Sequence, residues 1–284
     1  MNNNQIFDKS IMEIIKERRS VRTYEAKKLP QKVVESLISY GKEVEGPFDV
    51  KVRFELIDDL EAIEKSGNKV GTYGVISGAN AYLAAAAEDK EYNLEQVGYT
   101  LEKLILYATS LELGTCWLGG TFKRNGFEDI IGLKENEILP VVTPVGYPSS
   151  RKRILDSFMR LAAGSNNRKE WSDLFFEKSF NSPLRKEAAG QYYLALEMIR
   201  LAPSASNKQP WRILINEDGC HFYLDSTKGY SKALGFNIQR IDMGIAMCHF
   251  ELTMKEFGEK GRWGFIQQND KLASNITYII SWIK

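Results

Sequence analysis

The chain has 284 residues, 43% of them hydrophobic and 11% aromatic, which is enough for two units with buried cores. Its 38 Lys and Arg balance 37 Asp and Glu, so no global field attracts nucleic acid or an anionic membrane. Three cysteines without CxxC spacing indicate reduced thiols, and the two histidines lack partners at metal-ligand spacing. No apolar run approaches the roughly 20 residues of a membrane span. We expect a cytoplasmic protein without a metal site.

The first part of the chain alternates helix and strand patterns. Apolar residues at helical spacing predict a helix over residues 5–19 and another beginning near Pro30. A strand is expected at VKVRFELIDD, and a strand or short helix at NAYLAAAAED. A long helix is predicted from Leu94 to Leu113 with Gly114 as its stop. The prolines of ILPVVTPVGYP favour an edge strand or a bulge over the centre of a sheet.

The second part repeats this order. A helix at AAGQYYLALEMIRLA precedes a strand at WRILINEDG, and a long helix from Asn237 to Phe257 stops at Gly258. When Arg53 is set against Arg212 the two acid-ending strands coincide, and Glu112-Leu113-Gly114 is set against Glu256-Phe257-Gly258. We interpret this as a diverged duplication, with half one at residues 1–165 and half two at 166–284. Chance recurrence of helix and strand is the alternative.

Three segments are poorly explained by packing alone. RRSVR places Arg18 and Arg22 four residues apart with a serine between them, a fork that suits a phosphate, although a basic helix end also complements the helix dipole. APSASNKQPW joins a helix to a strand, and its hydroxyl and amide groups lie between two prolines. ELGTCWLGG follows a long helix, and its glycines allow a flat ligand to approach the backbone.

Together these segments resemble the nitroreductase family of flavoproteins, especially its fused subgroup with two nitroreductase-like halves in one chain. The resemblance implies an α+β fold in which each half has a mixed or antiparallel sheet and long helices, arranged as an intrachain pseudo-dimer. In that family, FMN sites lie at the interface of a homodimer. The resemblance therefore implies FMN as cofactor, NADH or NADPH as reductant, and nitroaromatics, quinones or similar small molecules as electron acceptors.

The resemblance also implies which residues bind the cofactor, and it implies no catalytic side chain. The FMN phosphate and ribityl end would be held by Arg18, Arg19, Ser20, Arg22, Arg151 and Arg153. The opposite half would contribute Pro203, Ser204, Ser206 and Asn207. The glycine segment would contribute Trp117, Gly119 and Gly120, with a glycine N–H near flavin N5. A hydride would enter at N5 and two electrons would leave to the acceptor, which predicts ping-pong kinetics.

The sequence departs from the family pattern in one respect. Half one has only GKEVEGPFD at the position of PSASNKQPW, and half two has FFEKSFNSP where half one has RRSVRTY. One composite site is complete and the other lacks both parts, so we expect a monomer with one FMN. Loss of a site is also typical of decay, which leaves a flavin-binding or storage protein as the alternative, and a cofactor-free structural protein as a third reading.

Overall fold

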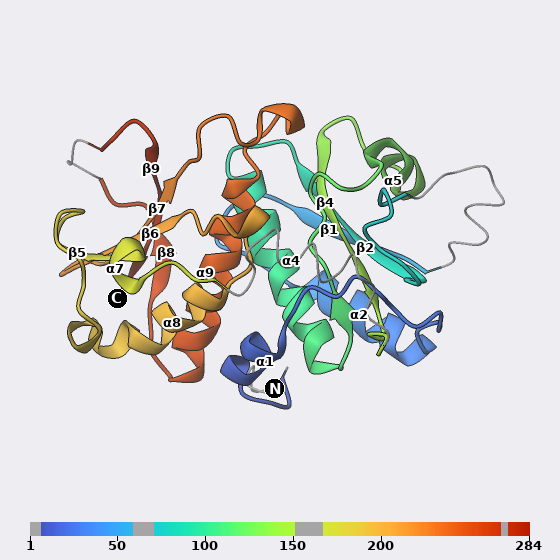
Figure 1. Ribbon diagram of the computed structural model, residues 1–284, viewed down its shortest axis with the longest axis horizontal. Coiled ribbons are helices and arrows are strands. Elements are labelled where there is room, and N and C mark those ends of the chain that lie inside the picture. The colour runs from blue at the N-terminus through green and yellow to red at the C-terminus, as the bar shows by residue number, and fades with distance from the viewer. Residues whose placement is uncertain (1–6, 59–70, 151–166, 268–271) are drawn as a thin grey trace. The chain divides into compact units, whose positions relative to one another are not determined.

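A computed structural model of the chain describes residues 7–58, 71–150, 167–267 and 272–284 (Figure 1). The chain forms two compact units, residues 1–162 and 163–284, which we call unit 1 and unit 2. The predicted boundary between the halves falls in residues 151–166, outside the described residues. Within the described residues, no helix is both long enough and apolar enough to cross a membrane.

The sheet of unit 1 is antiparallel and has the strand order β1-β2-β4-β3. Its strands are β1 (Val52–Ile57), β2 (Ala81–Glu88), β3 (Gly114–Thr115) and β4 (Glu137–Gly146). The alanine-rich segment left open between strand and helix is the strand β2, and nearly all of it is buried. Alanine favours helices when exposed. Here pairing with strands on both sides outweighs that preference, because strand propensity depends strongly on context.

The proline-containing strand β4 lies inside the sheet, so the expectation of an edge strand was wrong. The other expectation, a bulge in this strand, is confirmed. Ala85 pairs with Val141 and Ala87 with Ile138, so the register shifts beside Pro140. The bulge accommodates a residue that cannot donate to the ladder.

The described residues of unit 1 include four helices, α1 (Ile11–Glu17), α2 (Gln31–Glu43), α4 (Asn93–Ser110) and α5 (Arg124–Ile131). Of these, α2 and α4 pack against the sheet. The long helix α4 packs against β1, β2 and β3, and it also contacts α1 and α2 (Figure 1). Helix α1 is shorter than the helix predicted over residues 5–19. It starts directly after Ser10, which occupies the N-cap position, and it ends at Glu17. Its buried face, Ile11, Ile14 and Ile15, is as predicted where described.

The end of α4 differs from the prediction. The helix stops at Ser110, and Glu112 takes the left-handed conformation, with φ of 61°, that glycine usually supplies. Gly114 instead lies in β3, where a Cβ atom would come within 2.7 Å of the Val21 side chain. In unit 2 the stop is Gly258, as predicted, with φ of 72°. The two helix ends therefore match with Glu112, and not Gly114, opposite Gly258.

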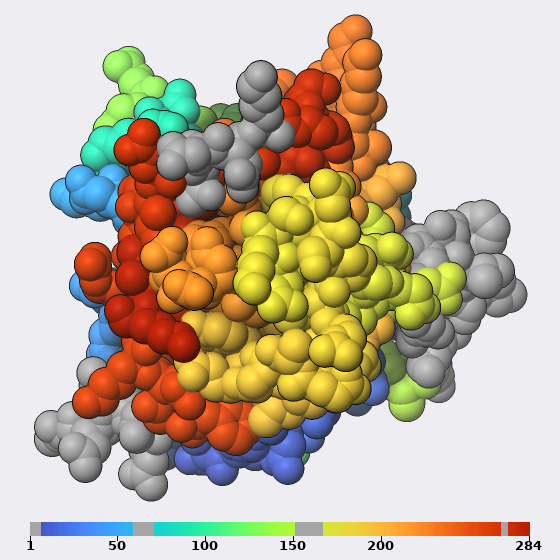
Figure 2. Space-filling model, turned by 90° about the vertical axis from the view of Figure 1, so that its left-hand side faces the viewer, coloured from blue at the N-terminus to red at the C-terminus, as the bar shows by residue number. Residues whose placement is uncertain are grey.

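Unit 2 has a mixed sheet with the order β5-β6-β7-β9-β8, in which only β5 and β6 are parallel. Its strands are β5 (Phe175–Glu177), β6 (Trp211–Asn216), β7 (Gly219–Asp225), β8 (Arg262–Gly264) and β9 (Ile276–Ile283). Its α-helices are α7 (Trp171–Leu174), α8 (Tyr193–Leu201) and α9 (Gln239–Glu256). Figure 2 shows the segment containing α7 and β5, in yellow, on the surface of this unit.

The helix predicted from Ala188 is only partly α-helical. Residues Lys186–Tyr192 form 3₁₀ turns, and α8 begins at Tyr193. Gly190, with φ of 53° and ψ of −131°, interrupts the helical backbone. Glycine adopts this conformation without a steric penalty, which explains why the continuous apolar pattern does not give one continuous helix.

The two units share their order of elements. The strands β1-β2-β4-β3 correspond in order to β6-β7-β9-β8, and each unit places one long helix against its sheet beside a shorter one, α2 or α8. Arg53 and Arg212 each occupy the second position of the first of these strands. Each forms an ion pair, Arg53 with Glu137 at 2.8 Å and Arg212 with Asp225 at 2.6 Å. The match of the two strands found in the sequence thus recurs in the structure, whereas the match of the helix ends is shifted by two residues.

Candidate functional site

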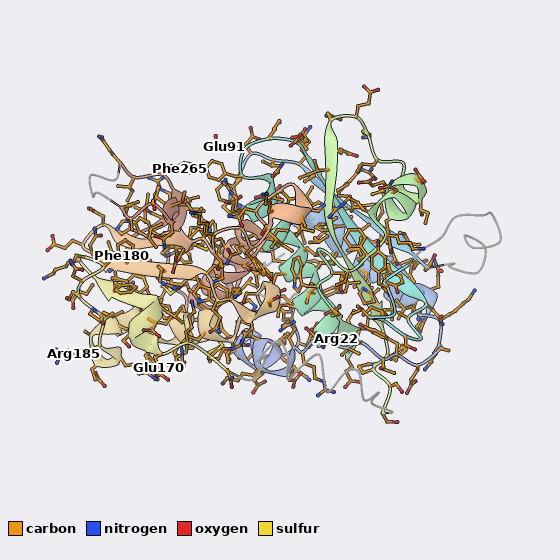
Figure 3. The ribbon with its side chains drawn as sticks, turned by 45° about the horizontal axis from the view of Figure 1, so that its top comes forward. Arg22, Glu91, Glu170, Phe180, Arg185 and Phe265 are labelled. Atoms are coloured by element: carbon orange, nitrogen blue, oxygen red, sulfur yellow. The ribbon has the colours of Figure 1, made fainter. Side chains whose placement is uncertain are left out.

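The arginine segment, residues 18–22, begins where α1 ends. The Arg18 side chain is 6% exposed, and its Nε and Nη1 atoms have no hydrogen-bond partner in the described part of the chain. Arg22 is labelled in Figure 3, and its Nε atom is also buried without a hydrogen-bond partner in that part of the chain. Buried donors are seldom left unsatisfied, and the guanidinium group stays charged. These donors therefore fit an anion with several acceptor oxygens, such as a phosphate.

A buried carboxylate connects this segment to the next loop. Glu102, on α4, is fully buried. Its Oε1 atom lies 3.8 Å from Arg18 Nε, and its Oε2 atom accepts a 2.8 Å hydrogen bond from Trp117 Nε1. The backbone adds a second connection, because Val21 N–H donates to the Thr115 carbonyl at 2.8 Å. Unit 1 thus brings two of the three predicted segments together.

The glycine loop, residues 117–120, is held by backbone hydrogen bonds at Leu118, the residue directly before its two glycines. The N–H groups of Leu118 and Val142 each donate to the other's carbonyl at 3.0 Å. The N–H groups of Gly119 and Gly120 donate to no group among the described residues. The loop therefore presents two backbone donors directly after a fixed pair of residues.

The serine loop, residues 203–209, connects α8 to β6 in unit 2 and has a strained backbone. Ser206, Asn207 and Gln209 have φ values of 48°, 53° and 48°. A left-handed conformation costs a residue with a Cβ atom roughly 1–2 kcal/mol. Such strain persists only where the surroundings fix it, and it is common at functional sites.

Side-chain hydrogen bonds fix this loop within unit 2. The bonds run from Gln209 N to Ser204 Oγ (2.9 Å), from Tyr230 OH to Ser206 Oγ (2.7 Å), from Arg168 Nη1 to Asn207 Oδ1 (2.6 Å) and from Asn207 Nδ2 to Asn167 O (2.7 Å). The two serine hydroxyls act as acceptors in these bonds, so each keeps a proton that it can donate to a ligand. The predicted binding side chains therefore also determine the shape of the loop.

A second buried carboxyl holds the serine loop from α9. Asp242 is 3% exposed, and its Oδ1 atom accepts a 2.9 Å hydrogen bond from Ala205 N–H. Its Oδ2 atom is buried without a hydrogen-bond partner in the described part of the chain. Burial raises the pKa of this carboxyl well above its usual range, and the hydrogen bond from Ala205 opposes that rise.

This pKa shift predicts a pH-dependent stability difference between the wild type and Asp242→Asn. The pKa is higher in the folded than in the unfolded chain, so the folded state binds the proton more tightly. Stability is therefore lost as the pH rises from about 4, the unfolded value, through the folded pKa. Asp242→Asn does not titrate, so its stability relative to wild type should increase with pH in urea unfolding of the FMN-free protein.

The matched control is the reverse change in unit 1, where Gln96 occupies the same position of α4 that Asp242 occupies in α9. Gln96→Glu introduces a carboxyl at a buried site, so it should lose stability relative to wild type as the pH rises. A stability difference between wild type and Asp242→Asn that stays constant between pH 4 and pH 8 would contradict the prediction.

The predicted site residues fall into two groups. Unit 1 holds Arg18, Arg19, Ser20, Arg22, Trp117, Gly119 and Gly120, and unit 2 holds Pro203, Ser204, Ser206 and Asn207. Arg19 is exposed, in contrast to Arg18. Arg151 and Arg153 lie outside the described residues.

The sequence interpretation missed three charged residues of these groups: Glu102, Asp242 and Arg168. The two acids lie in long helices whose apolar residues alone were used to define the buried face. Arg168 lies in the polar stretch interpreted as a linker. The only sequence signal for the acids is their position inside strongly apolar helices, where an acid that is buried requires a partner.

Comparisons with known proteins show the family to which the chain belongs. The sequence profile of a family described as "Putative TM nitroreductase" matches residues 10–254. A protein of Archaeoglobus fulgidus named "Putative NADH dehydrogenase/NAD(P)H nitroreductase" is 22% identical over 171 residues, covering 56% of this chain and 98% of its own. A protein of the same name from Methanothermobacter thermautotrophicus is 24% identical over 160 residues, covering 52% and 82%.

Among solved structures, a "putative nitroreductase" from Thermotoga maritima aligns with a TM-score of 0.58 at 20% identity, covering 97% of this chain and 94% of that one. This likeness confirms the α+β, nitroreductase-like fold class. The family profile spans most of the chain and confirms the resemblance found in its three segments. The protein therefore belongs to this nitroreductase family.

Proposed function

We propose that the protein is an FMN-dependent oxidoreductase that uses NADH or NADPH to reduce nitroaromatics, quinones or similar acceptors by two electrons. The observation that carries this proposal is the set of buried guanidinium donors on Arg18 and Arg22 that have no hydrogen-bond partner among the described residues. A terminal phosphate supplies acceptor oxygens for such donors. Membership of the nitroreductase family makes a flavin mononucleotide the best candidate for the molecule that carries this phosphate.

We further propose that one flavin binds per chain and draws on both units. The arginine segment and the glycine loop occur in unit 1, and the serine loop in unit 2. The connector between α2 and β1 in unit 1, residues 44–51, contains no serine or asparagine. The segment FFEKSFNSP of unit 2, whose first three residues form β5, contains no arginine. A monomer acting as an intrachain pseudo-dimer therefore contains the parts of one site and not of two.

The chain's own groups would bind and orient rather than transfer protons. Arg18 and Arg22 would hold the phosphate, and the N–H groups of Gly119 and Gly120 would hydrogen-bond to the ring. When bound, the flavin would supply the redox chemistry, since it accepts a hydride and passes on two electrons. Three buried cysteines that form no disulfide among the described residues fit a reducing compartment such as the cytoplasm.

The first test is the identity and amount of the bound cofactor. We expect the protein to purify yellow and to release FMN, at one equivalent per chain, when it is denatured. Chromatography of the released flavin against FMN and FAD standards, with protein determined by amino-acid analysis, measures both quantities. FAD alone, two tightly bound equivalents of FMN, or no flavin after reconstitution with excess FMN would refute the proposal.

Turnover distinguishes the enzyme from a flavin-binding or storage protein. Steady-state oxidation of NADH and NADPH is measured with a quinone and with a nitroaromatic as acceptor. An oxidoreductase should give parallel double-reciprocal plots, since reductant and acceptor use the same position in turn. Stoichiometric FMN binding with no oxidation above the rate of free FMN would favour the storage function.

A further inference from the structure

The long helix of each unit holds the connector that precedes the first strand of the shared pattern. The fourth residue of α4 is Gln96, and the fourth residue of α9 is Asp242. Gln96 Oε1 accepts from Phe48 N–H at 3.0 Å in the connector between α2 and β1. Asp242 Oδ1 accepts from Ala205 N–H at 2.9 Å in the serine loop between α8 and β6. One position thus performs one task in both units.

The two side chains differ in how well the protein satisfies them. The Gln96 amide is paired at both ends, because its Nε2 atom also donates to the Val50 carbonyl at 3.3 Å. Asp242 uses only Oδ1, and Oδ2 is buried without a partner among the described residues. An unsatisfied buried polar atom costs stability, and a carboxyl costs more than an amide. Unit 2 therefore has a side chain that costs more stability, Asp242, at the position where unit 1 has an amide with a hydrogen bond at both of its ends.

The two connectors also differ in backbone strain, and the strained connector is again the one in unit 2. The connector of unit 1 carries no left-handed residue among positions 44–51, whereas the serine loop carries three non-glycine residues with φ near 50°. Such a backbone requires a fixed anchor to persist. Ala205 lies directly before the first of these strained residues, Ser206, and its N–H is the atom that Asp242 holds.

We propose that Asp242 is a positioning residue of the flavin site, which fixes the strained serine loop at Ala205 in the conformation that binds the cofactor. This inference rests on the proposed function, because it assigns the serine loop to FMN. The inference extends the proposed site from the serine loop to helix α9, which holds this loop through Asp242. The raised pKa of Asp242 agrees with a group whose burial is maintained at a cost in stability.

The test uses the full chain and compares Asp242→Ala, Asp242→Asn and Gln96→Ala. FMN affinity is measured by quenching of flavin fluorescence on titration of the FMN-free protein. Asp242→Ala removes the acceptor and should weaken FMN binding at least tenfold. Asp242→Asn keeps an acceptor oxygen for Ala205 and should bind within threefold of wild type. Gln96→Ala loses the equivalent anchor in unit 1, outside the proposed site, and should also bind within threefold.

Hydrogen exchange gives a readout that is independent of FMN. In FMN-free protein, a peptide covering residues 202–210 should exchange at least tenfold faster in Asp242→Ala than in wild type, and unchanged in Asp242→Asn. If Asp242→Ala does not fold, Asp242→Ser, whose hydroxyl is one atom shorter, takes its place with the same expected changes. Unchanged exchange, wild-type FMN affinity in the alanine or serine variant, or an equal loss of affinity in Gln96→Ala would overturn the inference.

The two proposals fail in different ways. If wild-type protein binds no FMN, the proposed function fails, and the assignment of Asp242 to a flavin site fails with it. If wild-type protein binds FMN and the Asp242 variants bind it equally well, only the inference about Asp242 fails.

Discussion

Replacing Glu102 with alanine is expected to destabilise the protein by about 3–5 kcal/mol, the usual cost of removing one partner of a buried ion pair. Glu102 is fully buried, and Arg18, whose side chain is 6% exposed, lies 3.8 Å from it. Without the carboxylate, the Arg18 charge remains buried beside an indole N–H that has lost its acceptor. Urea unfolding of the FMN-free protein at neutral pH measures the change.

Unit 2 provides a matched control. Glu251 accepts a 2.6 Å hydrogen bond from Trp263 Nε1, so Glu251→Ala also removes a carboxylate that pairs with an indole. Its cationic partner, Lys255, is 59% exposed and can be hydrated again. The expected cost is therefore about 1.5–3 kcal/mol, that of a hydrogen bond to a charged group. Equal costs for the two variants would show that the Arg18 charge does not depend on Glu102.

A double replacement isolates the charge from the packing. Arg18→Met with Glu102→Leu removes both charges and keeps most of the buried volume. Replacement of a buried ion pair by apolar residues is often neutral or stabilising. The double variant should therefore be more stable than Glu102→Ala and should bind FMN more weakly than wild type. Higher stability than Glu102→Ala together with weaker FMN binding than wild type is expected if the ion pair is maintained for the ligand.

The sequence indicated the segments of the candidate site, but it did not indicate the residues that hold these segments. RRSVR and PSASN stood out because their side chains have little use in packing. Glu102 and Asp242 could not be found in this way, since the helix pattern assigns buried positions only to apolar residues. Helix α4 is buried over nearly all of its first ten residues, Glu95, Gln96 and Glu102 among them. An amphipathic pattern describes one buried face and cannot show that the opposite face is covered as well.

The errors in the fold have a similar origin. The alanines of β2 are strong helix formers, and only the neighbouring strands make this segment a strand. The prolines of β4 indicate an edge, but the strand lies inside the sheet, because its register with β2 shifts beside Pro140 and β3 pairs only with Val145 and Gly146. Gly114 looked like a helix stop because glycine usually is one, yet the close approach of Val21 explains it. In each case the deciding contact comes from a segment distant in sequence.

The change of Arg22 to alanine should weaken FMN binding by about 1.5–3 kcal/mol, or about 10- to 150-fold in Kd. The Arg22 Nε atom is buried and has no hydrogen-bond partner among the described residues, so the apo protein should lose little stability without it. Fluorescence titration at fixed ionic strength measures the affinity, and urea unfolding measures the stability. Lys16→Ala removes an exposed positive charge from the same helix end and should change Kd by less than about threefold.

Riboflavin separates the phosphate from the rest of the flavin, because it has the same ring and ribityl chain but no phosphate. If Arg22 acts on the phosphate, Arg22→Ala should bind riboflavin as wild type does while it loses affinity for FMN. Arg22→Lys keeps the charge but not the bidentate geometry, so its FMN affinity should lie between those of wild type and alanine. Equal losses for riboflavin and FMN would place Arg22 away from the phosphate, and loss of folding would make the arginine segment a structural helix end.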